Sequence, residues 1–416
     1  MSKLAIEGGK PVRDVNVNPF PARGLITEAE KAAAMKIFDE SISSGNAFGY
    51  NGKYEQQYEK DFAEFMGGGF ADGVNSGTNA VFVALGALNL EPFSEIIVPP
   101  ITDPGGCMPV TFIGCVPVVA DCDPRTYNTS AEQIEPLINE RTRAIIIAHI
   151  AGDPVDMNPI IELAKKHNLY IVEDCAQAHG AKYKGKLVGK LGDIAAFSTM
   201  FGKHHCTGGQ GGVVYTTNEE LYWQAKRFAD RGKPFNIENA NGNVRAGLNC
   251  NLNDLSAAIG SVQLKKLPDI LAKRRKIGET IKKELESFKA ISLGWQVSET
   301  ESSYWFLKIK LELDAIKVDK MTFCKALTAE GLSINPSYRH IPCEAIWFKE
   351  KKVFGNSGFP WNALEYKGER NPQFKIENAI KVTEEHFNIQ AHEGYGEREI
   401  ADILEALKKV ESAYIR

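Results

Sequence analysis

Three separate segments of the sequence carry residue types that could do chemistry together. Asn75-Ser76-Gly77-Thr78-Asn79 follows an expected strand and begins an expected helix, so its small residues leave N–H groups free for a phosphate at the positive end of the helix dipole. Asp174 ends another expected strand, where a sheet presents side chains to a crevice and a buried carboxylate needs a cationic partner. Lys203 lies in a loop of small residues, five positions after Ser198, and could form an imine with an aldehyde.

Each segment alone has an ordinary structural explanation; the first, for example, is also a good helix N-cap. Together they meet the requirements of one cofactor, pyridoxal 5'-phosphate (PLP): a phosphate cradle, a carboxylate for the pyridine nitrogen and a lysine for a Schiff base. The carboxylate keeps the ring nitrogen protonated, so that the ring can accept the electrons released when a proton leaves the substrate carbon. We therefore predict a PLP site.

Three other motifs are weaker candidates. Residues 208–212 are rich in glycine, but they open an expected strand, whereas a dinucleotide-binding loop opens a helix. Residues 180–186 fit the start of a P-loop, yet Leu187 stands where a Mg²⁺-binding Ser or Thr is required, so we expect a turn between strands. His204-His205-Cys206 suggests a metal cluster, but neighbouring side chains on an extended segment point to opposite faces. We expect no metal site.

The elements that must position these residues follow from the pattern of apolar runs. Short β-branched runs alternate with helical stretches between about residues 70 and 216, a pattern typical of a mainly parallel sheet covered on both faces. We predict strands at residues 95–99, 116–120, 144–149, 169–173 and 212–216, and helices at 78–89, 131–139 and 158–167. The fold class is therefore α/β.

The composition changes after about Leu264. Residues 265–288 are rich in Lys and Arg, with the spacing of a solvated, connecting helix. Beyond them we expect short strands at 304–313, helices at 320–330 and 398–414, and a long loop insertion at 341–372. We predict two domains: a large cofactor-binding domain at 1–265, which includes the N-terminal arm, and a small α+β domain at 266–416.

Length and composition exclude several classes of protein. The 416 residues suffice for two or three domains, and a net charge of −4 supplies no cationic field for a nucleic-acid backbone. No stretch is apolar enough for a membrane span, and the first ten residues do not read as a signal peptide. Eight scattered cysteines do not make a disulfide framework, so we expect buried thiols in a cytoplasmic protein.

The order and spacing of the motifs resemble the sugar aminotransferases of the DegT/DnrJ/EryC1/StrS family. The matching strings run through nearly the whole chain, and their combination is specific although no single string is. They are Glu7-Gly8-Gly9-Lys10-Pro11, Asn75-Ser76-Gly77-Thr78-Asn79-Ala80, Glu173-Asp174-Cys175-Ala176-Gln177-Ala178-His179-Gly180, Gly192-Asp193 with the following residues to Ser198, residues 208–212, Gly247-Leu248-Asn249, Leu255-Ser256-Ala257-Ala258-Ile259-Gly260, Gln263-Leu264 and Pro336-Ser337-Tyr338-Arg339-His340.

The resemblance implies a fold-type I PLP fold and a role for each matching residue. Lys203 would carry the cofactor as an internal aldimine and shuttle the proton, whereas His179 is expected to be structural. The other implied cofactor contacts are Asp174 at the pyridine nitrogen, Gln177 beside the ring hydroxyl, Gly77, Thr78 and Ser198 at the phosphate, and Asn249 at the phosphate of the neighbouring subunit. The family's active sites are shared across a homodimer. An amino group would pass from glutamate or glutamine to a keto-sugar, nucleotide-linked or phosphorylated, or to a keto-cyclitol.

Three positions depart from the family pattern. Asp103 stands where an aromatic residue usually stacks on the PLP ring, and Asn251 replaces a usual arginine. The loop after Ser198 is one residue longer, so counting back from residues 209–212 places His204 where the family has its lysine. We favour Lys203, but two alternatives follow: a sugar 3-dehydratase that uses pyridoxamine phosphate with His204 as base, and a catalytically silent PLP-fold regulatory protein.

Overall fold

A computed structural model describes residues 3–338 and 340–416, and its centre is a seven-stranded sheet in the order β1-β9-β8-β5-β4-β2-β3. β2, β3, β4, β5 and β8 pair in parallel, and β9 lies antiparallel between β8 and β1. The prediction of an α/β fold with a mainly parallel sheet is confirmed. The strands are β1 (Phe70–Val74), β2 (Glu95–Val98), β3 (Val116–Val119), β4 (Thr142–Ala148), β5 (Tyr170–Asp174), β8 (Ile194–Ser198) and β9 (Gly212–Thr216).

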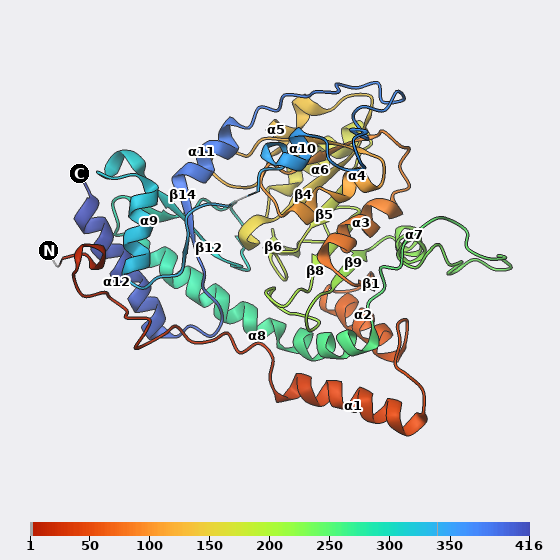
Figure 1. The fold of residues 1–416 in the computed structure, drawn as a ribbon, viewed down its shortest axis with the longest axis horizontal. Helices are drawn as coiled ribbons and strands as arrows, with labels where there is room; N and C mark the ends of the chain where they lie inside the picture. The colour runs from red at the N-terminus through yellow and green to blue at the C-terminus, as the bar shows by residue number, and fades with distance from the viewer. Residues whose placement is uncertain (1–2, 339) are drawn as a thin grey trace.

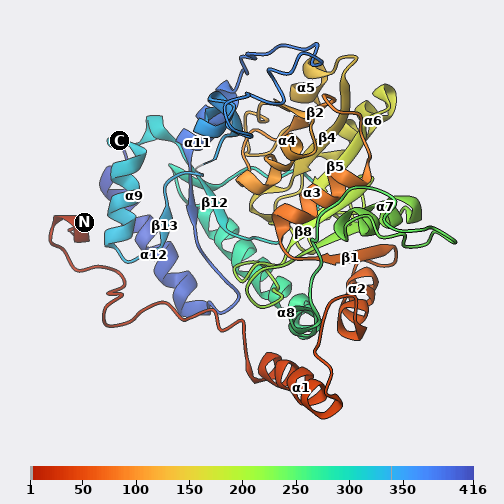
Figure 2. The same ribbon diagram turned by 45° about the vertical axis from the view of Figure 1, so that its right-hand side comes forward.

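Helices cover both faces of this sheet because the buried strands are apolar on both sides (Figures 1 and 2). On β4, Ile146 packs in one hydrophobic cluster with α3, whereas Ile145 and Ile147 pack in another with α6. The helices around the sheet are α2 (Lys53–Phe65), α3 (Gly77–Ala87), α4 (Pro109–Phe112), α5 (Ala131–Ile134), α6 (Met157–His167) and α7 (Glu219–Ala229). α1 (Glu28–Ser44) lies apart from the sheet and packs against the long helix of residues 254–285 (Figure 1).

One predicted helix was too long. We expected a helix over residues 131–139, but α5 ends at Ile134 and a 3-10 turn, Glu135–Leu137, follows. Pro136 explains the difference, because its ring lacks the N–H that an α-helix needs and clashes with the preceding turn. The expected turn at residues 180–186 is present as the hairpin of β6 (Lys182–Tyr183) and β7 (Lys186–Leu187).

A second sheet follows the long helix α8 (Asp254–Leu285), which runs from the first sheet to the second (Figure 1). This sheet has the order β10-β12-β14-β13. Its strands and helices are β10 (Ile291–Leu293), β12 (Leu307–Leu311), β13 (Ile334–Asn335), β14 (His386–Ile389), α9 (Lys320–Ala329), α10 (Ile346–Lys349), α11 (Glu377–Glu385) and α12 (Glu397–Tyr414), and the two-residue strand β11 (Thr300–Glu301) pairs with β6 instead. Residues 341–372 are mainly loop, as predicted.

The beginning of the N-terminal arm packs against the C-terminal elements, not against the large domain with which we expected it. The Glu330 carboxylate accepts the backbone N–H groups of Ala5 and Val12 at 2.9 and 3.0 Å. Arg13 forms ion pairs with Glu399 and Asp402 of α12. These contacts are made by buried polar groups that a search for apolar periodicity does not register.

Two further expectations concern the whole described chain. All eight cysteines are unpaired thiols, and seven of them are buried. None of the helices in residues 3–338 and 340–416 combines the length and apolar character that a bilayer crossing requires.

Candidate active site

A cavity of about 250 Å³ lies at the carboxyl ends of the parallel strands. Its lining comes from the segments that follow β1, β2, β4, β5 and β8, which is the edge where open α/β sheets bind ligands. Six of the seven predicted site residues line it, and Asn249 does not. The six are Gly77, Thr78, Asp174, Gln177, Ser198 and Lys203.

One end of the cavity is suited to a phosphate. Ser76 caps α3 by accepting the N–H of Asn79 at 3.1 Å, which leaves the N–H groups of Gly77 and Thr78 without a protein acceptor among the described residues. A Cβ on Gly77 would lie 2.5 Å from Cβ and 2.8 Å from Oγ of Ser198, so only glycine lets the two segments approach this closely. Two free N–H groups, a helix N-terminus and a hydroxyl make a cradle for a phosphate.

Asp174 places a buried carboxylate in the same cavity. One oxygen accepts the N–H of Ala176 at 3.0 Å. The other, Oδ2, would lie 2.7 Å from a Cβ on Gly106, so a glycine is needed beside it. Burial raises the pKa of Asp174, and the positive charge of Lys203 acts in the opposite direction. The ionised Asp174 carboxylate would be a suitable partner for a pyridine nitrogen, because it would stabilise the nitrogen in its protonated, positively charged form.

Lys203 reaches the cavity with its amine nearly free of partners. Nζ lies 4.0 Å from the ring centre of Trp305, and within residues 3–338 and 340–416 it makes no hydrogen bond. Burial lowers the pKa of Lys203 to about 8, while the carboxylates of Asp174 and Asp103 act in the opposite direction. A larger share of this amine than of an ordinary lysine is therefore neutral near pH 7, and the neutral amine is the nucleophile toward an aldehyde.

His204 lies behind Lys203 rather than in the cavity. Its Nε2–H donates to the carbonyl oxygen of Ser303 at 3.0 Å, and the ring is fully buried. Burial holds the pKa of His204 well below its ordinary value. His205 points elsewhere, toward the hydroxyl of Tyr58 at 2.9 Å, so the two adjacent rings do not share a ligand position. Of the two adjacent candidates, Lys203 lines the cavity and His204 does not.

The remaining predicted residues differ in their surroundings. Gln177 donates to the hydroxyl of Tyr338 at 2.7 Å and accepts the N–H of Ala151 at 2.9 Å, so its side chain is fixed at the cavity wall. Asn249 is exposed and accepts a hydrogen bond from Asn251 at 2.7 Å, outside the cavity. His179 donates to the carbonyl of Ser198 at 2.9 Å from a buried position off the cavity, in line with a structural role.

Sequence reasoning missed several residues of this site. His149 lines the cavity directly after β4, and the rule that site residues follow parallel strands could have found it. Its Nδ1 accepts the N–H of Val155 at 3.1 Å, so Nε2 carries the hydrogen that bonds to Glu173 at 3.1 Å. His149, Glu173 and Cys175 form a compact group, but these bonds occupy both ring nitrogens of the histidine. Trp305 belongs to no motif or periodic run that could have identified it from the sequence.

Asp103 stands where an aromatic residue was expected to stack on the PLP ring, so this part of the cavity is lined by a carboxylate and by the backbone that follows it. Asp103 lines the cavity and accepts the N–H of Gly105 at 2.9 Å. A Cβ on Gly105 would lie 2.3 Å from the Thr78 hydroxyl, so the chain after Asp103 runs directly against the phosphate end. Arg339, which belongs to one of the matching strings, lies outside the described residues.

Comparison with known proteins gives a consistent result. Residues 28–408 match the DegT/DnrJ/EryC1/StrS aminotransferase family. The chain is 36% identical over 284 residues to a GDP-perosamine synthase of Escherichia coli O157:H7, which covers 68% of this chain and 75% of that one. It is 32% identical over 366 residues to a GDP-perosamine synthase of Caulobacter vibrioides, with 86% and 90% coverage. The crystal structure of an aminotransferase from Psychrobacter cryohalolentis superimposes with a TM-score of 0.83 at 29% identity, covering 95% of this chain and 99% of that one.

Proposed function

Because the chain belongs to the DegT/DnrJ/EryC1/StrS family and is a PLP-dependent aminotransferase, we propose that it transfers an amino group from glutamate or glutamine to a keto-sugar or keto-cyclitol, with Lys203 as the residue that binds the cofactor covalently. The cavity supports this assignment, since its residues offer a phosphate cradle, a buried carboxylate and a free amine. When bound, PLP supplies an electron sink for the carbon that loses its proton.

In this proposal the protein's own groups bind the cofactor phosphate, orient the cofactor ring and move a proton. The N–H groups of Gly77 and Thr78 and the hydroxyl of Ser198 bind the phosphate, and Gln177 orients the ring edge. The Asp174 carboxylate would stabilise the protonated form of the ring nitrogen, because the two charges have opposite signs. Nζ of Lys203 would be the base that carries the proton to and from the substrate carbon.

The observation that carries the proposal is the opposite orientation of two neighbouring side chains. Lys203 lines the cavity, whereas His204 bonds to the carbonyl of Ser303 behind it. A 3-dehydratase that uses His204 as its base would need that ring in the cavity. The transaminase reading is therefore the one that the geometry supports.

The acceptor is proposed from the relatives. Two of them are named GDP-perosamine synthase, which favours a nucleotide-linked keto-sugar over a sugar phosphate or a cyclitol. The long insertion at residues 341–372 is where we place acceptor selectivity. Tyr338, which leads into the insertion, contacts Gln177 at the cavity wall.

We also propose that the working unit is a homodimer. An apolar hollow of about 580 Å³ adjoins the cavity, because Thr78 lines both of them. Phe112 and Leu248, which line the hollow, are 57% and 60% exposed. Asn249 follows Leu248 directly and is itself exposed, so a second copy seated on this hollow would meet it.

An absorbance spectrum before and after addition of glutamate and of glutamine tests the proposal. A shift of bound PLP to the amine form with either donor supports a transaminase, and no shift with either contradicts it and favours a silent PLP-fold protein. Borohydride treatment should fix the cofactor to the peptide that contains Lys203, and Lys203→Ala should remove this product; a cofactor that dialyses away from the wild type would favour the dehydratase. GDP-perosamine, tested as a donor in the reverse direction, should produce the same shift if the acceptor is a GDP-linked sugar.

A further inference from the structure

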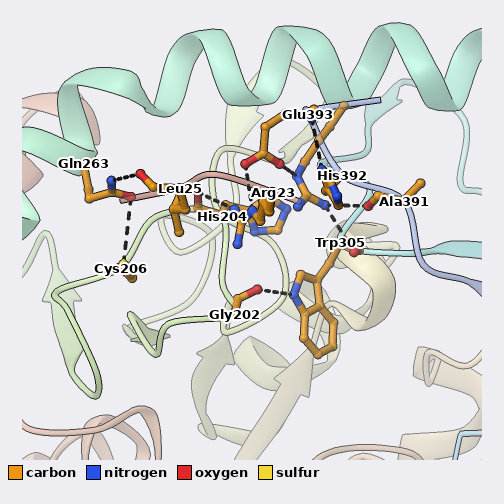
Figure 3. A network of polar contacts seen from close by, with 12 residues as sticks. Arg23, Leu25, Gly202, His204, Cys206, Gln263, Trp305, Ala391, His392 and Glu393 are labelled. Carbon is orange, nitrogen blue, oxygen red and sulfur yellow. Dashed lines mark hydrogen bonds and ion pairs between the residues drawn. The ribbon is translucent and has the colours of Figure 1, made fainter. Parts of the chain in front are cut away.

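The residues on both sides of Lys203 are each anchored by a distant part of the chain (Figure 3). Before it, the carbonyl of Gly202 accepts the indole N–H of Trp305 at 3.2 Å. After it, the carbonyl of His204 accepts a guanidinium N–H of Arg23 at 3.0 Å. Nζ of Lys203 makes no hydrogen bond among the described residues, and the backbone N–H of Lys203 bonds only locally, to the carbonyl of Met200 at 2.9 Å. The position of the amine therefore depends on these anchors of the neighbouring backbone.

The anchor after Lys203 is part of a buried ion network. Nε of Arg23 pairs with Glu393 at 2.7 Å, while Nη2 of the same guanidinium reaches His204. The second oxygen of Glu393 pairs with Arg274 of α8 at 2.8 Å, and Arg274 also donates to the carbonyl of Trp305 at 3.2 Å. Burial and these partners make the network stiff: the side chains of Arg23, Glu393 and Arg274 are 17%, 9% and 4% exposed.

The N-terminal arm is held against the segment that carries Glu393. His392 donates to the carbonyl of Pro21 at 3.1 Å, and Phe20 stacks on Tyr395 with ring centres 5.0 Å apart. Arg23 thus links the arm, the loop before α12 and the loop of Lys203. None of the motifs that carry the cofactor chemistry includes either Arg23 or Glu393.

We propose that Arg23, held by Glu393, is a positioning residue that fixes the Lys203 loop so that the lysine amine stays enclosed in the cofactor cavity. This inference rests on the proposed function for its catalytic meaning. Arginine suits the task because different nitrogens of one planar group serve the carboxylate and the carbonyl. A lysine at position 23 could pair with Glu393, but it lacks the planar fork that directs one nitrogen at the carboxylate and another at the carbonyl.

The test measures the pH at which the amine of Lys203 loses its proton in the cofactor-free full-length protein, because this pH depends on how well the amine is shielded from water. Labelling by an amine reagent, 1-fluoro-2,4-dinitrobenzene, is followed against pH at the Lys203 peptide by mass spectrometry. The midpoint should lie near the pKa of about 8 in the wild type. The carboxylates that face this amine are Asp174 and Asp103. Arg23→Met and Glu393→Gln should admit water and shift the midpoint upward by about 0.5 to 1 pH unit.

Two further variants separate positioning from general stabilisation. Arg141→Met removes a partly buried arginine that pairs with the buried Glu95 outside the cavity, and it should lower the thermal midpoint without moving the labelling midpoint. Arg23→Lys should keep most of the thermal stability yet show the raised labelling midpoint. A wild-type labelling midpoint in Arg23→Lys would overturn the proposal, whatever Arg23→Met does.

The outcome is distinguishable from a failure of the proposed function. Labelling of the cofactor-free protein reports on the Lys203 loop whether or not Lys203 binds PLP. If borohydride fixes the cofactor elsewhere while the labelling midpoint shifts as expected, the proposed function is wrong and the positioning role stands. If borohydride fixes the cofactor at Lys203 and Arg23→Lys labels like the wild type, the positioning role alone is wrong.

Discussion

Nζ of Lys203 lies 4.0 Å from the ring centre of Trp305, over the aromatic face. Two effects of this packing oppose each other, because an aromatic face attracts the charged ammonium whereas burial disfavours it. Burial prevails, since the pKa of Lys203 is lowered to about 8. The enclosure that Trp305 provides thus makes the amine more reactive near neutral pH.

Uptake of PLP by the cofactor-free protein should follow this pKa. The rate of covalent uptake should rise with pH around a midpoint near 8, because the neutral amine is the nucleophile. Asp103→Asn should move the midpoint downward, since that carboxylate raises the pKa of Lys203, and Asp314→Asn at an exposed distant site should not. Stopped-flow absorbance measures the rate; a midpoint near the ordinary lysine value of about 10.4 would contradict the expectation.

A methyl group on Gly77 should damage the phosphate end of the site. Its Cβ would lie 2.5 Å from Cβ of Ser198, so Gly77→Ala must push the helix N-terminus and Ser198 apart. We expect PLP to bind at least about tenfold more weakly, which corresponds to about 1.4 kcal/mol. Equilibrium titration of PLP measures this, and Gly209→Ala, where a Cβ meets no atom within 4 Å, is the matched control. Equal affinities in the two variants would refute the cradle.

The buried carboxylate of Glu173 should be important for folding. It accepts the Nε2–H of His149 and the N–H groups of Gly189, Leu191 and Gly192 at 2.6–3.1 Å. Glu173→Gln would turn an NH₂ group toward some of these donors, and we expect it to cost about 2–4 kcal/mol in the free energy of unfolding. Urea unfolding measures the loss. Glu312→Gln, at an exposed ion pair with Lys310, should cost less than about 1 kcal/mol.

The positions that follow parallel strands were the part of the site that the sequence could reveal. Asp174 is the last residue of β5 and Lys203 follows β8, and the topology of such a sheet gathers the ends of its parallel strands at one edge. The same rule would have included His149. The α/β fold was predictable because most of the buried strands are nearly continuous apolar runs separated by helical stretches.

The partners of Lys203 could not be found in this way. Trp305 and Arg23 lie about 100 and 180 positions away, and neither belongs to a periodic run that would place it. Their contacts run through backbone carbonyls of Gly202 and His204, which are present in every sequence and therefore carry no signal. The docking of the N-terminal arm on the C-terminal elements escaped prediction because it depends on buried ion pairs such as that of Arg13 with Asp402.

Buried histidines should make stability fall in mild acid. Burial lowers the pKa of His386 to about 3, and the pKa values of His179, His204 and His205 are lowered for the same reason. Below the unfolded pKa of about 6.5 the unfolded chain binds protons that the folded one cannot, so stability is complete above that pH and is lost as the pH falls toward 3.

His386→Gln should remove the part of this acid-dependent loss of stability that is due to His386. Removal of the ring should flatten the dependence of the unfolding free energy on pH by up to about 1.4 kcal/mol per pH unit between pH 6 and 4. Urea unfolding at several pH values measures the slope, which is independent of any constant loss of packing. His167→Gln, at an exposed position, should leave the slope unchanged. An unchanged slope in His386→Gln would show that this ring is protonated in the folded protein.

Shared active sites can be tested by mixing two inactive variants. If Asn249 serves the neighbouring subunit's phosphate, Asn249→Glu should weaken PLP binding strongly, because a carboxylate repels the phosphate, while Lys203→Ala removes the amine. In a mixed dimer both defects fall in one site, and the other site receives an intact Lys203 and an intact Asn249. Mixing the two proteins under conditions of subunit exchange should therefore restore the spectral response to glutamate or glutamine, up to a quarter of the wild-type amplitude when exchange is complete. The same variants mixed with themselves are the control. If Asn249 acts only within its own chain, each mixed dimer keeps one defect in each site and mixing restores nothing.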